Sequence, residues 1–202
     1  MTTTPPPAAP PRIAVMLSGS GRTLDNLVVA IREERLRASI VLVIASRECL
    51  GATKARAAGI ETLIMPGVIE AGVLERTLVE RRIDWVVLAG YLKFIHVPGA
   101  FTGRVVNIHP SLLPAFGGPG MYGDRVHAAV ISAGAKESGC TVHLVDEVYD
   151  HGQVVLQRSC PVLPGDDART LAARVFVEEC IAYPAALQHL FAGGVASRPA
   201  HH

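Results

Sequence analysis

Short aliphatic runs alternate with helical patterns along the first half of the chain, and this alternation restricts the fold more than any other feature. The run SIVLVIA over residues 39–45 is apolar at nearly every position, which is typical of a parallel strand covered on both faces. Leu24, Leu27, Val28 and Ile31 recur at helical spacing and form one apolar face. The sequence predicts strands over 12–18, 39–45, 61–65, 84–89 and 104–108, with helices over 22–35, 51–58 and 71–82 between the first four.

The second half of the chain begins with a Gly-rich loop over residues 116–123, too long for a tight turn. A helix is predicted over 126–133, followed by a hairpin of two strands over 140–145 and 153–162. The last helix is predicted over 167–191, where Pro184 indicates a kink or an interruption. We expect an α/β fold with a Rossmann-like, mostly parallel twisted sheet and helices on both faces, extended by a C-terminal β-hairpin and a closing helix.

Length and composition predict one domain over residues 12–193, between a disordered Pro-rich tail at 1–11 and a flexible tail at 194–202. A formal net charge of +1 gives no large field of one sign, so nucleic acid and acidic membranes are not expected partners. No apolar run reaches the ~18 residues of a membrane span. Four widely spaced cysteines and the lack of a secretory leader predict free thiols in the cytoplasm.

The stretch NIHPSLLP over residues 107–114 follows the strand predicted at 104–108. Side chains alternate along a strand, so Asn107 and His109 project to the same side. Pro110 has no N–H for a sheet ladder, and strand pairing should therefore end there. A carboxamide and an imidazole are thus expected side by side at the carboxyl end of a strand, where ligands bind in open α/β sheets.

The segment SGSGRT over residues 18–23 joins the first strand to the first helix. It is neither a Walker A loop nor GxGxxG, because Leu24 takes the place of the third glycine. The free N–H groups of the helix start suit one phosphate monoester, with Thr23 adding a hydroxyl and Arg22 a charge. A tight turn that simply needs small residues is the alternative.

Two further segments are expected at the same edge of the sheet and are candidates for parts of a ligand site. The segment GYLKFI over 90–95 follows the fourth strand and suits one wall of a pocket for a flat heteroaromatic ring, although plain strand-to-helix packing explains it equally well. Asp150 lies in the hairpin loop before Gly152, which permits an unusual backbone conformation. Near His109, this carboxylate would orient the imidazole and raise its pKa; the alternative is a residue that only forms the turn.

Histidines are frequent enough in this region to raise a metal site as a competing interpretation. The separations between the candidates match no compact ligand pattern such as HExxH, so no metal is expected; the candidates are His109, His127, His143, Asp150 and His151. A nucleophilic mechanism has little support, because no GxSxG is present and no cysteine lies in a suggestive context.

Taken together, the motifs resemble the phosphoribosylglycinamide formyltransferases of purine biosynthesis. The order is SGSGRTL at 18–24, LAGYLK at 88–93, NIHPSLLP at 107–114, and GCTVH at 139–143 with DHG at 150–152. The resemblance extends from about residue 12 to residue 193, nearly all of the folded chain. Asn–x–His with a downstream Asp marks the wider formyltransferase group, whereas the glycine turn and compact length point to the glycinamide ribonucleotide enzymes.

The resemblance implies the formyltransferase fold and the transfer of a formyl group from 10-formyltetrahydrofolate to the amine of phosphoribosylglycinamide. It implies that the catalytic residues are Asn107, His109 and Asp150. The implied contacts to the ribonucleotide are Ser20, Gly21, Arg22, Thr23 and Glu179. The implied contacts to the folate are Leu88, Leu92, Lys93, Phe94, Ile95 and Asn107. The protein is expected to be a monomer or a homodimer that needs no metal.

The sequence also departs from the family. Ala71 stands where an Arg is common, so one contact to an anion is missing or supplied elsewhere, and the loop at 116–123 leaves the alignment of Arg125 and His127 open. The family often has a cis peptide before the proline that matches Pro114, and we expect one here. Other folate-dependent formyltransferases, formyltetrahydrofolate deformylase and a non-catalytic sugar-phosphate-binding module are the alternative functions.

Overall fold

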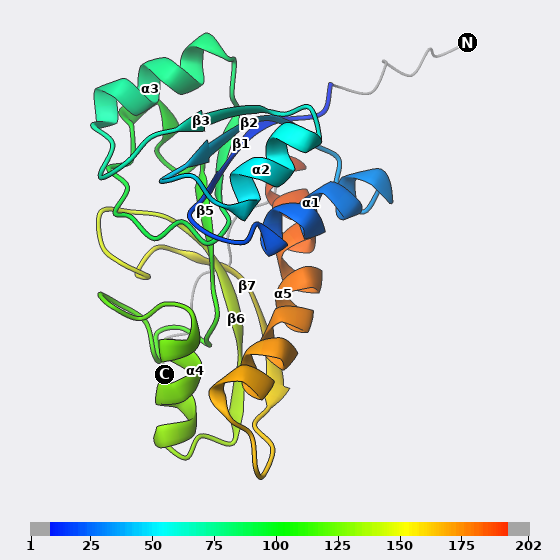
Figure 1. The fold of residues 1–202 in the computed structure, drawn as a ribbon, viewed down its shortest axis with the longest axis vertical. Helices are drawn as coiled ribbons and strands as arrows, with labels where there is room; N and C mark the ends of the chain where they lie inside the picture. Colours follow the sequence, from blue (N-terminus) through cyan, green and yellow to red (C-terminus); the bar gives the residue numbers. More distant parts are fainter. Residues whose placement is uncertain (1–8, 194–202) are drawn as a thin grey trace.

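A computed structural model of the protein describes residues 9–193 and shows a seven-stranded sheet of order β3-β2-β1-β4-β5-β6-β7 (Figure 1). The strands are β1 (Arg12–Leu17), β2 (Ser39–Ala45), β3 (Glu61–Ile64), β4 (Trp85–Leu88), β5 (Val105–His109), β6 (Glu137–Leu144) and β7 (Val154–Pro161). The helices are α1 (Arg22–Arg32), α2 (Leu50–Ala57), α3 (Ala71–Glu80), the 3-10 helix η1 (Gly99–Phe101), α4 (Asp124–Ser132) and α5 (Ala168–Phe191). The tail predicted at 194–202, and residues 1–8 of the one predicted at 1–11, lie outside the described part.

The sheet confirms the predicted architecture. Strands β1 to β5 pair in parallel, and β6 and β7 add the predicted antiparallel hairpin next to β5. The hairpin is longer than predicted, because β6 begins at Glu137 and pairs with the end of β7 from there. Gly139, one residue before the predicted start of this strand, is a point of close approach: a Cβ at this position would collide with the carbonyl oxygen of Arg158.

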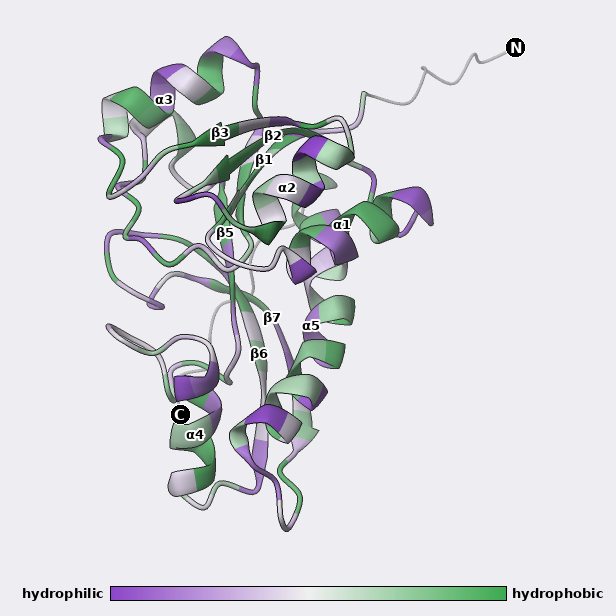
Figure 2. Ribbon diagram, in the orientation of Figure 1, coloured by the Kyte–Doolittle hydropathy of each residue, from purple (hydrophilic) through white to green (hydrophobic). Residues whose placement is uncertain are grey.

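Helices cover both faces of the sheet, as predicted. The alternation along β1 sends Ile13, Val15 and Leu17 into a core shared with α1, α2 and α5. Ala14 and Met16 face the opposite core, which α3 and η1 cover. Figure 2 shows β1 and β2 green over most of their length, whereas the helices carry both green and purple. Burial of strand residues on both faces explains why the runs in the sequence are continuous rather than alternating.

The last helix does not break at Pro184, and the predicted interruption is therefore wrong: α5 is continuous from Ala168 to Phe191. Proline lacks the N–H that would bond the carbonyl four residues earlier, which belongs to Cys180. The Asn26 side chain of α1 donates a hydrogen bond to this carbonyl over 3.3 Å. A tertiary contact thus replaces part of what the helix loses.

Tyr183 attaches α5 to the centre of the sheet. Its side chain is fully buried, and its hydroxyl lies 2.9 Å from the Leu88 carbonyl oxygen and 3.0 Å from that of Val106. Burial raises the pKa of this hydroxyl well above its usual range, so the group stays a donor. Tyr183 therefore holds the ends of β4 and β5 at Leu88, a predicted site residue, and at Val106, the residue before Asn107.

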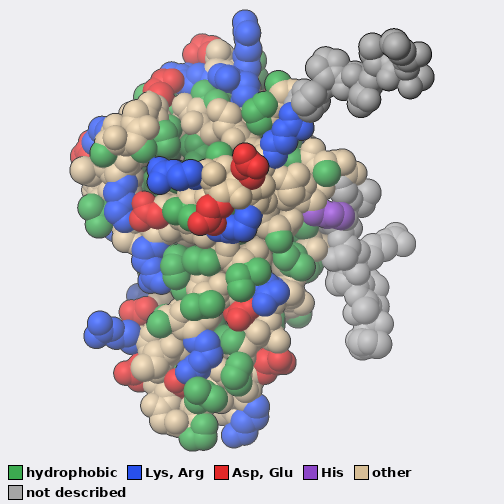
Figure 3. Space-filling view, turned by 90° about the vertical axis from the view of Figure 1, so that its right-hand side faces the viewer, with side chains coloured by type: hydrophobic (Ala, Val, Ile, Leu, Met, Phe, Trp, Pro, Cys, Tyr) green, Lys and Arg blue, Asp and Glu red, His purple; other side chains and the backbone are tan. Residues whose placement is uncertain are grey.

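The side of the molecule that carries α1, α2 and α5 shows basic, acidic and apolar side chains interspersed (Figure 3). This mixed surface agrees with the net charge of +1. Within residues 9–193, no helix is both long enough and apolar enough to cross a membrane.

The start of α2 packs directly on the turn that follows β1. The Gly51 N–H donates a hydrogen bond to the Gly19 carbonyl oxygen over 2.9 Å. A Cβ at Gly51 would lie 2.9 Å from this oxygen and 3.1 Å from the Cα of Gly21. Only glycine fits here without moving the turn.

We predict opposite effects of alanine at two glycines that are each the second residue of a helix. Gly51→Ala should destabilise the fold by about 1–3 kcal/mol, because the methyl group displaces the turn at Gly19 and Gly21. Gly72→Ala in α3 should stabilise it by about 0.5–1 kcal/mol, because alanine favours the helix and the nearest atom, on the Arg76 side chain, is 3.7 Å away. Urea unfolding measures both, and equal effects would contradict the packing argument.

Candidate active site

A cleft of about 390 Å³ opens at the carboxyl ends of the strands. It lies where the chain leaves β1 and β4, whose neighbours extend in opposite directions across the sheet, the position at which open α/β sheets bind ligands. The structure brings all the predicted site residues to this cleft: Ser20, Gly21, Arg22, Thr23, Leu88, Leu92, Lys93, Phe94, Ile95, Asn107, His109, Asp150 and Glu179. Ala71, the position of the missing arginine, begins α3 and is not among the lining residues.

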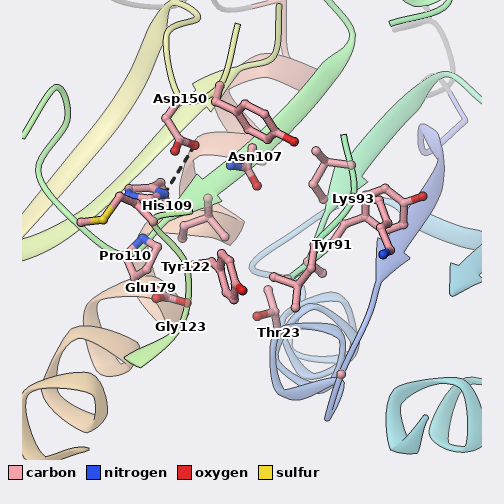
Figure 4. A pocket seen from close by; sticks show the side chains of 18 of the residues that line it. Thr23, Tyr91, Lys93, Asn107, His109, Pro110, Tyr122, Gly123, Asp150 and Glu179 are labelled. Carbon is pink, nitrogen blue, oxygen red and sulfur yellow. Dashed lines mark ion pairs between the residues drawn. The ribbon is translucent and has the colours of Figure 1, made fainter. Parts of the chain in front are cut away.

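Asn107 and His109 both belong to β5, which ends at His109 as the following proline predicts. His109 is 4% exposed, and its Nδ1 lies 3.4 Å from Oδ1 of Asp150, the contact dashed in Figure 4. The predicted approach of the loop carboxylate to the strand-end imidazole is therefore confirmed. An imidazole held by a carboxylate is suited to acid–base chemistry.

The loop that carries Asp150 has a different geometry from the one predicted. The left-handed residue is Asp150 itself, with a φ of 53°. Gly152 is required for space, because a Cβ there would collide with the Leu144 carbonyl oxygen. Backbone strain of this kind is concentrated at functional sites, where surrounding contacts hold it.

The backbone of the Gly-rich loop bonds both members of this pair, a contact that the sequence did not predict. Nε2 of His109 donates to the Phe116 carbonyl oxygen over 2.9 Å. The Gly118 N–H donates to Oδ2 of Asp150, also over 2.9 Å. Phe116 has a φ of 57°, and Leu113–Pro114 is cis, as expected from the resemblance. Both ring nitrogens of His109 thus face acceptors.

His143 is a residue of the cleft that the predicted set of site residues lacks. It lies on β6 directly opposite Asn107, and its Nε2 is 3.1 Å from Nδ2 of that residue. Burial lowers the pKa of His143. Thr141 and His143 are two residues apart on β6 and project to the same face, but only the register of β5 against β6 shows which of them lies opposite Asn107.

The turn before α1 has the features of an anion site. Gly21 is the N-cap, with a φ of 74° and no side chain to bond the first N–H groups of the helix. Arg22 lies over the Phe176 ring of α5, its guanidinium carbon 3.7 Å from the ring centroid. Free N–H groups, the helix dipole and a fixed cation together favour a phosphate group.

Glu179 faces the cleft from α5. Burial raises its pKa to about 7, while the positive charge of Arg22 opposes the shift. The Tyr122 ring, which the sequence analysis did not assign to the site, projects into the cleft from the Gly-rich loop (Figure 4). Its neighbour Arg125 stacks on it, 5.0 Å from the ring centroid.

The opposite wall is apolar and lies after β4. Leu92 is half exposed in the cleft, and the Phe94 ring packs edge-on against Tyr149, with centroids 5.1 Å apart. Val148 beside Tyr149 is also exposed on this rim. Exposed apolar side chains next to backbone polar groups suit a flat heteroaromatic ligand.

Residues 9–193 contain no group of three or more His, Cys, Asp or Glu side chains that could hold a metal ion. His127, one of the histidines of the metal interpretation, is buried in α4, and burial lowers its pKa. His151 is instead exposed and pairs with Asp146 over 2.8 Å. The arrangement as a whole places hydrogen-bond donors and an imidazole–carboxylate pair between a turn whose geometry favours an anion and an apolar wall.

Comparison with known proteins identifies relatives of this sequence. A family model described as formyl transferase matches residues 11–187. A chloroplastic phosphoribosylglycinamide formyltransferase of Vigna unguiculata is 43% identical in an alignment of 178 residues that covers 83% of this chain. A trifunctional purine biosynthetic protein adenosine-3 of Drosophila pseudoobscura pseudoobscura is 40% identical in an alignment of 195 residues that covers 91% of this chain. The chain spans 57% of the length of the first protein and 14% of the second.

Comparison with solved structures also finds a glycinamide ribonucleotide transformylase with the same fold. The crystal structure of glycinamide ribonucleotide transformylase 1 from Symbiobacterium toebii superimposes with a TM-score of 0.86 at 34% sequence identity. The likeness covers 95% of this chain and 93% of that one. The fold and most of the length are therefore shared with this structure.

The raised pKa of Glu179 predicts how stability depends on pH. The pKa is about 7 in the folded protein and near its ordinary 4.5 in the unfolded chain, so between these values the folded state holds a proton that the unfolded state releases. Stability from this group is present below pH 4.5 and is lost as pH rises through 7, by up to ~1.4 kcal/mol per pH unit. Urea unfolding of the wild type should show this slope relative to Glu179→Gln, and parallel curves would contradict it.

Proposed function

This chain belongs to the formyl transferase family, and on that premise we propose that it transfers the formyl group of 10-formyltetrahydrofolate to the amino group of 5-phosphoribosylglycinamide. The products are formylglycinamide ribonucleotide and tetrahydrofolate. The observation that carries the proposal is the cleft in which Asn107, His109 and Asp150 lie between an anion-binding turn and an apolar wall. The names of the relatives in Vigna unguiculata and Symbiobacterium toebii support the choice of acceptor.

Each end of the cleft takes one substrate in this proposal. The ribonucleotide phosphate binds at Gly21, Arg22 and Thr23, beside Ser20, because the helix N–H groups and the guanidinium favour an anion. Glu179 accepts hydrogen bonds from the ribonucleotide when it is ionised. The pterin of the co-substrate lies against the apolar wall, formed by Leu88, Leu92, Phe94, Ile95 and the stem of Lys93.

The reaction is a direct transfer between two bound molecules. The amine nitrogen attacks the formyl carbon, a new C–N bond forms, and the carbonyl electrons move onto the formyl oxygen. N–H groups of Asn107 and His109 stabilise this oxyanion. The bond from the formyl carbon to the folate nitrogen then breaks, and the proton lost by the amine reaches that nitrogen with the help of His109 and Asp150.

The contacts of His109 add a condition to this mechanism. Its Nδ1 faces Asp150, and its Nε2–H is bonded to the Phe116 carbonyl, so an oxyanion has to take the place of that carbonyl. The backbone between Phe116 and α4 contains three glycines with positive φ, which permit such a rearrangement: Gly118, Gly120 and Gly123. We therefore include a shift of this loop in the proposal.

The four free thiols suit a cytoplasmic enzyme.

An assay with and without the proposed acceptor tests which molecule receives the formyl group. Incubation with 10-formyltetrahydrofolate should release tetrahydrofolate only when phosphoribosylglycinamide is added, with one formylated product per folate, as followed by absorbance and mass spectrometry. Release without any acceptor would identify a deformylase. Release with another amine alone would identify a different formyltransferase, and no release in any mixture would indicate a binding module.

Alanine variants test the three catalytic residues. Asn107→Ala, His109→Ala and Asp150→Ala should each lower kcat by roughly 100-fold or more, the scale of a lost oxyanion donor or acid–base group. His151→Ala removes an exposed imidazole from the same hairpin loop and should leave kcat unchanged. Steady-state assays with circular dichroism of each variant measure this, and near-normal turnover by His109→Ala would overturn the mechanism.

A further inference from the structure

His143 is buried in the cleft, yet the mechanism above gives it no role. It is 2% exposed and lies directly opposite Asn107 in the antiparallel pair β5–β6. Its Nδ1 is 2.9 Å from the Leu144 carbonyl oxygen, and its Nε2 is 3.1 Å from Nδ2 of Asn107. Both ring nitrogens therefore have partners of known chemical type.

These two partners determine the protonation of the ring. A carbonyl oxygen only accepts, so the hydrogen must be on Nδ1. The amide nitrogen of Asn107 only donates, so Nε2 must present its lone pair. The contacts are thus consistent with one form, the neutral imidazole protonated at Nδ1.

The surroundings of His143 have opposing effects on the charge of its ring. Oδ1 of Asp150 lies 3.7 Å from Nε2, and this carboxylate and that of Asp146 favour the charged ring. Burial and the neighbouring His109 favour the neutral ring, and burial is the largest of these effects. The environment therefore agrees with the form that the hydrogen bonds require.

We propose that neutral His143 is a positioning residue that fixes the orientation of the Asn107 carboxamide. By accepting one N–H of Nδ2, it holds the nitrogen, rather than the oxygen, on its side of the amide. The second N–H of Nδ2 is then available to the formyl oxygen. The hydrogen-bond pair stands on the geometry alone, whereas its kinetic consequence depends on the proposed function.

The charged form of the ring would reverse the arrangement. With a hydrogen on Nε2, the carboxamide gains by turning its oxygen towards His143, and the donor nitrogen moves to the former place of the oxygen. The oxyanion would then lose a positioned donor. His143 therefore acts on catalysis through Asn107 and not by contact with the reacting atoms.

Two variants separate positioning from structural support. His143→Gln places an amide oxygen where it can accept from Asn107, and it should keep kcat within a few-fold of wild type. His143→Leu fills the space but cannot accept, and kcat should fall by between about 5-fold and 100-fold, the range from a lost buried hydrogen bond to a lost oxyanion donor. KM for both substrates should change little in either variant, and His151→Leu controls for the loss of an imidazole. Equal kcat in His143→Leu and wild type would overturn the proposal.

A measurement without turnover keeps the proposal independent of the proposed function. In ¹⁵N-labelled protein at pH 7, the His143 ring should give the signals of a protonated Nδ1 and an unprotonated Nε2, and the Asn107 side-chain amide should shift in His143→Leu but not in His151→Leu. A charged ring or a protonated Nε2 would overturn the proposal, whether or not formyl transfer is observed. Should His143→Leu fail to fold by circular dichroism, the wild-type spectrum and the kcat of His143→Gln decide the question.

Discussion

The site depends on the two different neighbours of β5. Parallel pairing with β4 sets Asn107 beside Leu88, where the apolar wall of the cleft begins. Antiparallel pairing with β6 sets His143 opposite Asn107 and Thr141 opposite His109. Because side chains alternate, a slip of one residue would turn Ile108 into the cleft and bury both polar groups on the wrong face. Tyr183 of α5 donates to the carbonyl oxygens of Leu88 and Val106, and these bonds hold the ends of β4 and β5 together.

Burial favours the neutral form of both an acid and a base in the cleft, and it therefore shifts their pKa values in opposite directions. It lowers the pKa of His143, which has to stay neutral, and raises the pKa of Glu179 to about 7. His109 has a carboxylate partner in Asp150, whose other oxygen accepts from the loop backbone. In a site of low polarity these hydrogen bonds and charges interact more strongly than in water. A movement of the loop at 116–123 that admits water should therefore weaken the hydrogen bonds and charge interactions throughout the cleft.

The sequence was sufficient for the elements and for the gathering of most site residues, since both follow from local patterns. Continuous aliphatic runs identified the buried strands, and the rule that ligands bind at the carboxyl ends of strands located the cleft. The partner of Asn107 could not be predicted, because it depends on the register between segments 36 residues apart. The contact of Phe116 with His109 depends on the left-handed backbone of Phe116 itself, which a phenylalanine does not indicate. Pro184 was misleading because Asn26, far away in the sequence, bonds the carbonyl it leaves free.

The bond between His109 and the Phe116 carbonyl also has a consequence for how the proposed reaction is catalysed. A buried imidazole needs partners before substrate arrives, and the loop supplies a neutral acceptor. The formyl oxygen of a bound substrate is a neutral acceptor too, so exchanging one for the other changes the energy little. The oxyanion of the transition state is charged, and hydrogen bonds to it are roughly twice as strong. Displacing the carbonyl costs the same in both states, so it cancels the gain from the formyl oxygen in the ground state, and the stronger hydrogen bond to the oxyanion is the difference that raises kcat.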